Sequence, residues 1–181
     1  MPVSAARAAA FDILMRVGQQ GAYASELLHS AQFRTLSATD HGLATQLTMG
    51  VLRWQSALDS TLASVSSQNL NRLDPEVLTA LRLGLFQMRY LERIPARAAI
   101  FESVELVKRA RKSSAAPFVN ALLRKAQKLS ALSNESDPHD ATTLSVATAH
   151  PFWLVERWIK HFGLDHARAI CNFNQTIPIT A

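Results

Sequence analysis

Residues 39–65 read TDHGLATQLTMGVLRWQSALDSTLASV and carry the most regular apolar spacing in the chain. The apolar positions recur at steps of four, four, three, four, four and three residues, at Leu43, Leu47, Val51, Trp54, Leu58, Leu62 and Val65. Only an α-helix with one buried face needs this spacing, because 3.6 residues complete a turn. The spacing therefore predicts one long helix that ends at Val65 and bends near Gly50.

Helical spacing extends over most of the remaining chain, and no alternating strand pattern occurs before the last few residues. Glycine, proline and polar turns separate the segments, as at Ile94-Pro95 and Gly163. The other predicted helices span about 4–17, 22–31, 74–93, 95–109, 115–129, 150–162 and 165–173. The pattern predicts an all-α fold, with residues 175–181 approaching a strand.

The composition changes after residue 129. Residues 130–147 are polar, acidic and rich in turn-forming residues, which is typical of a linker. We therefore expect a domain over 1–129, a linker over 130–147 and the start of a second region over 148–181. Two small helices and an extended tail bury too little apolar surface to form a domain. We expect the chain to be cut short relative to its natural parent.

The positive charge is concentrated in one block. The chain has 181 residues and a formal net charge of +5, but residues 82–128 alone carry eleven basic and three acidic side chains. Cations on helix faces predict contact with a polyanion, because each phosphate contact releases counterions. The candidate nucleic-acid-binding residues are Arg82, Arg89, Arg93, Arg97, Lys108, Arg109, Arg111, Lys112, Arg124, Lys125 and Lys128.

A solvated helix face is the competing interpretation of these cations. Cations near helix C-termini favour the helix dipole, which explains four of them singly: Lys108, Arg109, Lys125 and Lys128. It does not explain why acidic residues are scarce here. Arg82, Arg89 and Arg93 fall within about 20° of one another at 100° per residue, which predicts one common helix face.

Four aromatic side chains could stack on bases: Trp54, Phe86, Tyr90 and Phe101. Trp54 belongs to the apolar stripe of residues 39–65, so we expect it in the core.

The sequence gives less support to a metal site or to a nucleophilic catalytic site. His161 and His166 lie on different helix faces, and the Ser, Asp and His residues of 136–140 are crowded into the predicted linker.

The single cysteine, Cys171, cannot form an intramolecular disulfide, which fits a reducing, cytoplasmic compartment. Its place on an amphipathic segment predicts a buried thiol. No apolar run approaches the length of a membrane span, so we expect no membrane partner. We also expect no bound metal, no cofactor and no catalytic residue in this chain.

Several stretches in a fixed order resemble a known family. They are GVLRW (50–54), LRLGLFQ (81–87), YLERIPA (90–96), ESVELVK (102–108), FVNALLR (118–124) and HPFWLVERW (150–158). The first five resemble the NusB-like RNA-binding domain. With the Arg53-Trp54 pair, the last is similar to the N-terminal part of the RsmB (Sun/Fmu) family of 16S rRNA cytosine-C5 methyltransferases.

The resemblance implies two packed three-helix bundles, followed by the helical start of an incomplete pre-catalytic α/β region. It implies an RNA-binding, substrate-positioning module whose partner is small-subunit rRNA. The parent would be an rRNA (cytosine-C5)-methyltransferase that uses S-adenosyl-L-methionine, whereas this chain alone would not be an enzyme. Stand-alone NusB proteins open with an arginine-rich stretch. This chain has only Arg7 and Arg16 there, which favours the block at 82–128.

Two alternatives remain at this point. The basic block could meet an acidic protein or the attached catalytic domain, which would make the chain a protein-interaction module. The chain could also be a NusB-type transcription antitermination factor. The segment after residue 147 disfavours this last interpretation, because free-standing factors of that type lack it.

Overall fold

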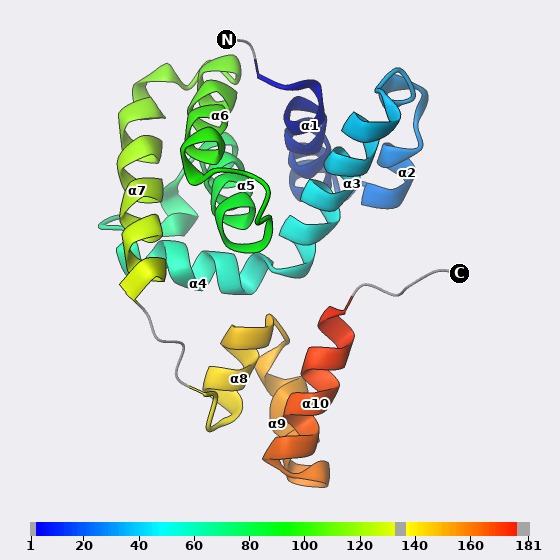
Figure 1. Cartoon of the computed structure of the whole chain (residues 1–181), viewed down its shortest axis with the longest axis vertical. Helices are drawn as coiled ribbons and strands as arrows, with labels where there is room; N and C mark the ends of the chain where they lie inside the picture. Colours follow the sequence, from blue (N-terminus) through cyan, green and yellow to red (C-terminus); the bar gives the residue numbers. More distant parts are fainter. Residues whose placement is uncertain (1–2, 133–136, 177–181) are drawn as a thin grey trace.

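The computed structural model describes residues 3–132 and 137–176, which form helices and loops with no strand among them (Figure 1). The prediction of an all-α protein is confirmed. The α-helices are α1 (Ala5–Gln20), α2 (Ala24–Leu28), α3 (Ala38–Arg53), α4 (Gln55–Val65), α5 (Pro75–Tyr90), α6 (Ala96–Arg109), α7 (Ala116–Leu132), α8 (Ala141–Thr148), α9 (Phe152–Phe162) and α10 (Leu164–Gln175). None of the described helices is long and apolar enough to cross a bilayer.

The first seven helices form two bundles that pack against each other through α5. Helices α1, α2 and α3 enclose a small core that includes Ile13, Leu27 and Phe33. Helices α5, α6 and α7 form the second bundle, and α4 crosses below it in Figure 1. α5 is buried on most of its surface, because it contacts α1, α3, α4, α6 and α7. The expected pair of packed three-helix bundles is thus present.

The single helix predicted over residues 39–65 is wrong, because the structure has two helices there. α3 ends at Arg53 and α4 begins at Gln55, with Trp54 between them at φ −97° and ψ 11°. The apolar spacing continues across this break because both helices turn their buried side chains, such as Leu47 and Leu58, to the same core. Spacing alone therefore cannot distinguish one straight helix from two that wrap a common core.

The bend predicted near Gly50 is displaced by four residues, because Gly50 lies within α3 and the helix breaks at Trp54. A Cβ at this position would overlap the ring of Phe86. The glycine therefore serves helix packing, since its missing side chain lets α5 approach α3 closely.

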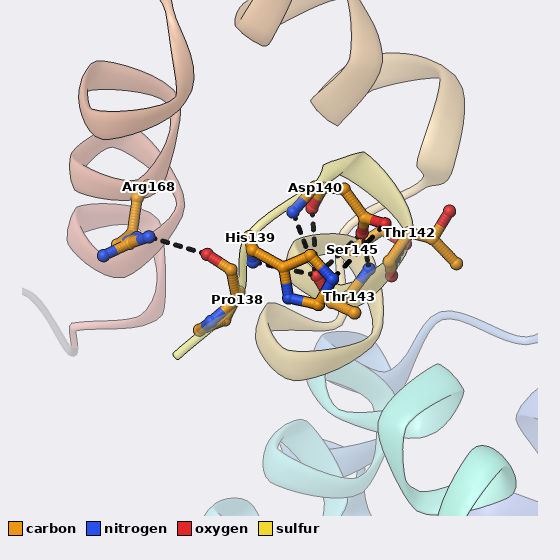
Figure 2. Close-up of polar contacts among 7 residues, drawn as sticks. All are labelled: Pro138, His139, Asp140, Thr142, Thr143, Ser145 and Arg168. Atoms are coloured by element: carbon orange, nitrogen blue, oxygen red, sulfur yellow. Dashed lines mark hydrogen bonds and ion pairs between the residues drawn. The ribbon is translucent and has the colours of Figure 1, made fainter. Parts of the chain in front are cut away.

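Part of the predicted linker is helical. α8 begins at Ala141, and the preceding residue Asp140 is its N-cap, whose carboxylate accepts a hydrogen bond from the backbone N–H of Thr143 at 2.7 Å. The Thr143 hydroxyl in turn accepts from the backbone N–H of Asp140 at 3.2 Å, which completes a capping box (Figure 2). Aspartate and threonine are typical of loops, but here they satisfy the free amides that begin a helix. Residues 133–136 of the linker lie outside the described residues.

Helices α8, α9 and α10 enclose a separate small core of Leu144, Val155, Ala167 and Cys171. Cys171 is buried as predicted, and burial raises the pKa of its thiol. This unit packs on the rest of the protein through α8 and α4. The expected strand approach at 175–181 is wrong at its start, because Gln175 ends α10, and residues 177–181 lie outside the described residues.

Candidate nucleic-acid interface

Ion pairs hold several of the candidate cations. Carboxylates lie within 4.0 Å of four of them: Asp59 pairs with Arg82, Glu105 with Lys108, Asp12 with Arg109 and Asp74 with Lys112. The Arg82 guanidinium donates two hydrogen bonds of 2.7 Å to Asp59, which joins α5 to α4. Bidentate geometry of this kind is the strongest form of side-chain ion pair. Arg82 is therefore a structural residue that holds two helices together.

The turn between α6 and α7 is also tied to the body of the protein. Arg109 donates two hydrogen bonds of 2.7 Å to Asp12 of α1, which raise the pKa of the guanidinium. Lys112 lies 3.0 Å from Asp74, and that hydrogen bond raises the pKa of the ammonium. These carboxylates neutralise much of the positive charge at this turn. Arg111 is exposed beside them in a left-handed conformation, with φ 60°.

The expectation that Arg82, Arg89 and Arg93 share one helix face is wrong for Arg93. α5 ends at Tyr90, and the backbone leaves helical geometry at Leu91, with φ −118° and ψ 85°. Arg93 therefore lies in the α5–α6 connection. Arg89 donates to the Thr61 hydroxyl at 3.2 Å, and its guanidinium lies 5.8 Å from the centre of the Tyr90 ring.

The remaining cations fall in two places. Arg97 lies in the first turn of α6, close in sequence to Arg93, and both are exposed. The other place is the exposed surface of α7, which carries Arg124, Lys125 and Lys128. Lys125 donates to the carbonyl of Val65 at 2.9 Å, so it also caps the end of α4.

These cations do not all gather in one patch. α6 has 14 residues and is thus about 21 Å long, which separates Arg97 from the α6–α7 turn. The block that is continuous in sequence is therefore divided in space, with the α6–α7 turn at one end of α6 and the α5–α6 connection at the other. The α5–α6 connection, the first turn of α6 and the surface of α7 hold exposed cations that lack a carboxylate partner among the described residues.

A groove that the sequence did not predict runs between α3 and the α5–α6 connection. It consists of two adjoining cavities of about 730 Å³ and 560 Å³. Both are lined by Gly42, Gln46, Tyr90 and Leu91, so they form one continuous feature. Pockets of this size are typical of sites for small ligands or for parts of larger ones.

Arginines and aromatic rings line the groove. Arg53 lines the smaller cavity, and Arg93 lines the larger one together with Glu92. The rings of Trp54 and Tyr90 are stacked, with 4.6 Å between their centres and 24° between their planes. Trp54 is half-buried, so its predicted place in the core is only partly correct. The Arg53-Trp54 pair is visible in the sequence, but the regular apolar spacing of residues 39–65 indicated a core position for Trp54 rather than a place in a groove.

The aromatic candidates differ in exposure. Phe86 is buried against Gly50 and Tyr90, so it supports the groove from beneath. Phe101 is exposed on α6, away from both cavities. The sequence predicts base stacking equally for both rings, because helical spacing does not show which side of a helix its neighbour covers.

The weaker candidates have structural roles. Asp137 accepts a hydrogen bond from Arg168 at 2.8 Å. Asp140 caps α8, and Arg168 also donates to the Pro138 carbonyl at 2.6 Å (Figure 2). Within residues 3–132 and 137–176, no group of three His, Cys, Asp or Glu side chains could hold a metal ion. Ser136 lies outside the described residues.

Two helical bundles around a shared central helix, with cations along the second bundle, define the class of this protein. Residues 4–128 match the NusB family, which covers both bundles. The chain therefore belongs to the NusB family.

Relatives and solved structures extend this result. The chain is 36% identical over 179 residues to a probable ribosomal RNA small subunit methyltransferase B of Bacillus subtilis, covering 98% of this chain and 40% of the relative. A crystal structure of the antitermination factors NusB and NusE in complex with dsRNA contains a chain that is 26% identical, with a TM-score of 0.63. The match covers 68% of this chain and 94% of that chain.

A third comparison, with the crystal structure of PH0851, covers 98% of this chain and 40% of that one with a TM-score of 0.72 at 14% identity. It shows that the fold of this chain, α8 to α10 included, recurs within a longer protein. The chain thus spans about two fifths of the length of the methyltransferase relative and of this structural neighbour.

Proposed function

We propose that this chain is the RNA-binding, substrate-positioning module of an S-adenosylmethionine-dependent rRNA (cytosine-C5) methyltransferase. The observation that carries the proposal is the extent of the alignment with methyltransferase B, which reaches 98% of this chain. The NusB family match stops at residue 128, whereas the methyltransferase similarity continues through α8, α9 and α10. A free antitermination factor does not account for that additional similarity.

RNA binding is supported by the exposed positive charges of this chain and by its similarity to a NusB structure. The exposed cations of α7 and of the α5–α6 connection provide partners for phosphates, which position a protein on RNA without selecting a sequence. The related NusB structure holds double-stranded RNA. For this chain we propose small-subunit rRNA as the partner, and a cytoplasmic location where that rRNA is assembled.

The methyl transfer itself belongs, in this proposal, to the part of the relatives that this chain does not span. S-adenosylmethionine would supply the methyl group there. The residues described do not fit this cofactor, because a Rossmann-like site lies at the ends of parallel strands and residues 3–132 and 137–176 contain no sheet. Cys171 is buried with a raised pKa, so it is unsuited to act as the nucleophile.

Binding of fluorescently labelled 16S rRNA fragments, followed by anisotropy at increasing salt, tests the proposal. The logarithm of the association constant is expected to fall linearly with the logarithm of salt, by about 0.7 to 0.9 per phosphate contacted. We expect Arg124→Glu/Lys128→Glu to weaken binding about tenfold or more, because two phosphate contacts on α7 become repulsive.

A matched control is Arg157→Glu/Lys160→Glu, which makes the same charge change on the exposed surface of α9. Its affinity is expected to stay within about twofold of the parent, since screening weakens charge interactions over distances beyond about 10 Å. Absence of RNA binding at low salt, or an affinity that does not change with salt, would refute the proposed function.

A protein-interaction module is the second candidate. Exposed apolar side chains on the last two helices favour it, including Trp153 at 63% exposure and Phe173 at 77%. Apolar exposure of this kind is typical of surfaces that meet another protein or domain. If Trp153→Ser/Phe173→Ser keeps full RNA affinity but loses association with the catalytic domain, this second role is correct.

A further inference from the structure

We infer that the groove between α3 and the α5–α6 connection binds an unpaired, single-stranded stretch of RNA. The inference rests on the proposed RNA-binding function and adds the kind of RNA and the place where it binds. In this arrangement a base packs at the Trp54–Tyr90 stack, and the flanking phosphates meet Arg53 and Arg93.

The shape of the groove supports a chain-like ligand. Its two cavities, of about 730 Å³ and 560 Å³, share four lining residues and are both open to solvent. Each cavity contributes one exposed arginine, Arg93 in the larger and Arg53 in the smaller. Cations in both cavities suit a ligand that carries repeated negative charges and passes through the groove.

The charges of the groove favour a polyanion. Arg53 and Arg93 have no carboxylate partner among the described residues. Arg7 also lines the larger cavity, but it donates to Gln87 at 2.6 Å and lies 3.7 Å from Glu102. Glu92 is the acidic residue that lines the groove, so the two available arginines leave a positive balance.

The aromatic stack favours unpaired bases over a duplex. Trp54 and Tyr90 line the smaller cavity directly, supported from beneath by Phe86, whose ring centre is 5.3 Å from that of Tyr90. Bases in a duplex are stacked on one another and cannot reach such a surface, whereas bases of a single strand can. Phosphate contacts alone would not distinguish the two forms of RNA, but this aromatic surface does.

The groove can be blocked without disturbing the core. Gly42 lines both cavities and is exposed, and a Cβ built at this position would meet nothing within 4 Å. Gly42→Trp therefore places a bulky side chain where the ligand would lie. Gly42→Ala is the matched control, because it adds only a methyl group at the same position.

The experiment uses the fluorescence of Trp54. The background variant Trp153→Phe/Trp158→Phe leaves Trp54 as the single tryptophan of the chain. A short oligouridine is titrated against this protein, and a duplex of matched charge serves as the comparison. We expect saturable quenching of Trp54 by oligouridine and little change with the duplex.

Groove variants then locate the binding. The affinity of these variants is measured by the anisotropy of labelled oligouridine, because Gly42→Trp adds a second tryptophan to the groove. Gly42→Trp and Arg53→Glu/Arg93→Glu are each expected to lower oligouridine affinity about tenfold, which corresponds to the loss of one stacked base or of two phosphate contacts. Gly42→Ala is expected to bind like the background protein. Circular dichroism confirms that every variant keeps its helical content.

The outcomes separate the two proposals. If oligouridine or rRNA binds but leaves Trp54 unaltered, and Gly42→Trp binds normally, RNA binding stands and the groove assignment is overturned. If no RNA binds at low salt, the proposed function fails, and the groove assignment fails with it. If polyglutamate quenches Trp54 and oligouridine does not, the groove takes an acidic polypeptide and the inference is wrong.

Discussion

At the residue scale, two glycines show how closely the central helix is packed. A Cβ on Gly50 of α3 would overlap the Phe86 ring of α5, and a Cβ on Gly84 of α5 would lie 2.5 Å from the Ser103 hydroxyl of α6. The two glycines thus allow close approach between α5 and its neighbours on two sides. Glycine costs a helix about 1 kcal/mol relative to alanine, so the packing gained must exceed this cost.

Gly50→Ala is expected to lower the free energy of unfolding by about 1–3 kcal/mol, because Phe86 must leave its place in the core. Urea denaturation followed by circular dichroism measures the change. Gly42→Ala on the same helix is the control, and it is expected to raise stability by up to about 1 kcal/mol, since its methyl group meets open space. Equal stability of the two variants would contradict this account.

At the element scale, the start of α8 depends on a few hydrogen bonds. The carboxylate of Asp140 accepts from the backbone and the hydroxyl of Thr143, and these bonds hold its pKa below the ordinary value of 3.8. A lowered pKa means that the folded state favours the ionised form. The contribution of this cap is therefore present above about pH 3.8 and is lost as the pH falls through the lowered pKa.

Asp140→Ala is expected to speed hydrogen exchange in the first turn of α8, because the backbone amide of Thr143 loses its acceptor. Asp140→Asn keeps a capping oxygen but has no carboxylate to titrate. It should therefore retain protection at neutral pH and lose the acid dependence. Exchange measured by mass spectrometry between pH 3 and 7 would contradict the capping role if all three proteins behaved alike.

At the scale of the whole molecule, the chain has cores of very different size. The main core contains buried side chains from α1 and from α3, α4, α5, α6 and α7, among them Leu81 and Leu123. The C-terminal core has four buried apolar residues among those that the structure describes. Burial of apolar surface is the dominant stabilising contribution. The unit of α8, α9 and α10 should therefore open at a lower free energy than the two bundles.

Val155→Ala removes buried apolar volume from the C-terminal core and should destabilise it by about 2 kcal/mol. We expect faster hydrogen exchange in α8, α9 and α10 with unchanged exchange in α5. Val119→Ala in α7 is the matched control, since Val119 is equally buried in the main core, and it should speed exchange in α5 instead. Loss of protection in α5 caused by Val155→Ala would show that the two cores unfold together.

The sequence alone determined the helical content, the class of fold and the total charge of the basic block. Apolar spacing and turn residues act over a few positions, so they can be interpreted locally. Apolar spacing did not show the helix break at Trp54, because the two helices on either side of it face one core. Turn residues did not show that α8 follows Asp140, because here loop-forming residues cap a helix.

Only the tertiary structure decided which cations remain available and where the groove lies. Arg109 is neutralised by Asp12, a residue 97 positions away, and Arg82 by Asp59, 23 positions away. The groove likewise joins Arg53 of α3 to Arg93 of the α5–α6 connection. Charge and apolar spacing are properties of the sequence, whereas neutralisation and exposure depend on which distant residues the packed helices bring together.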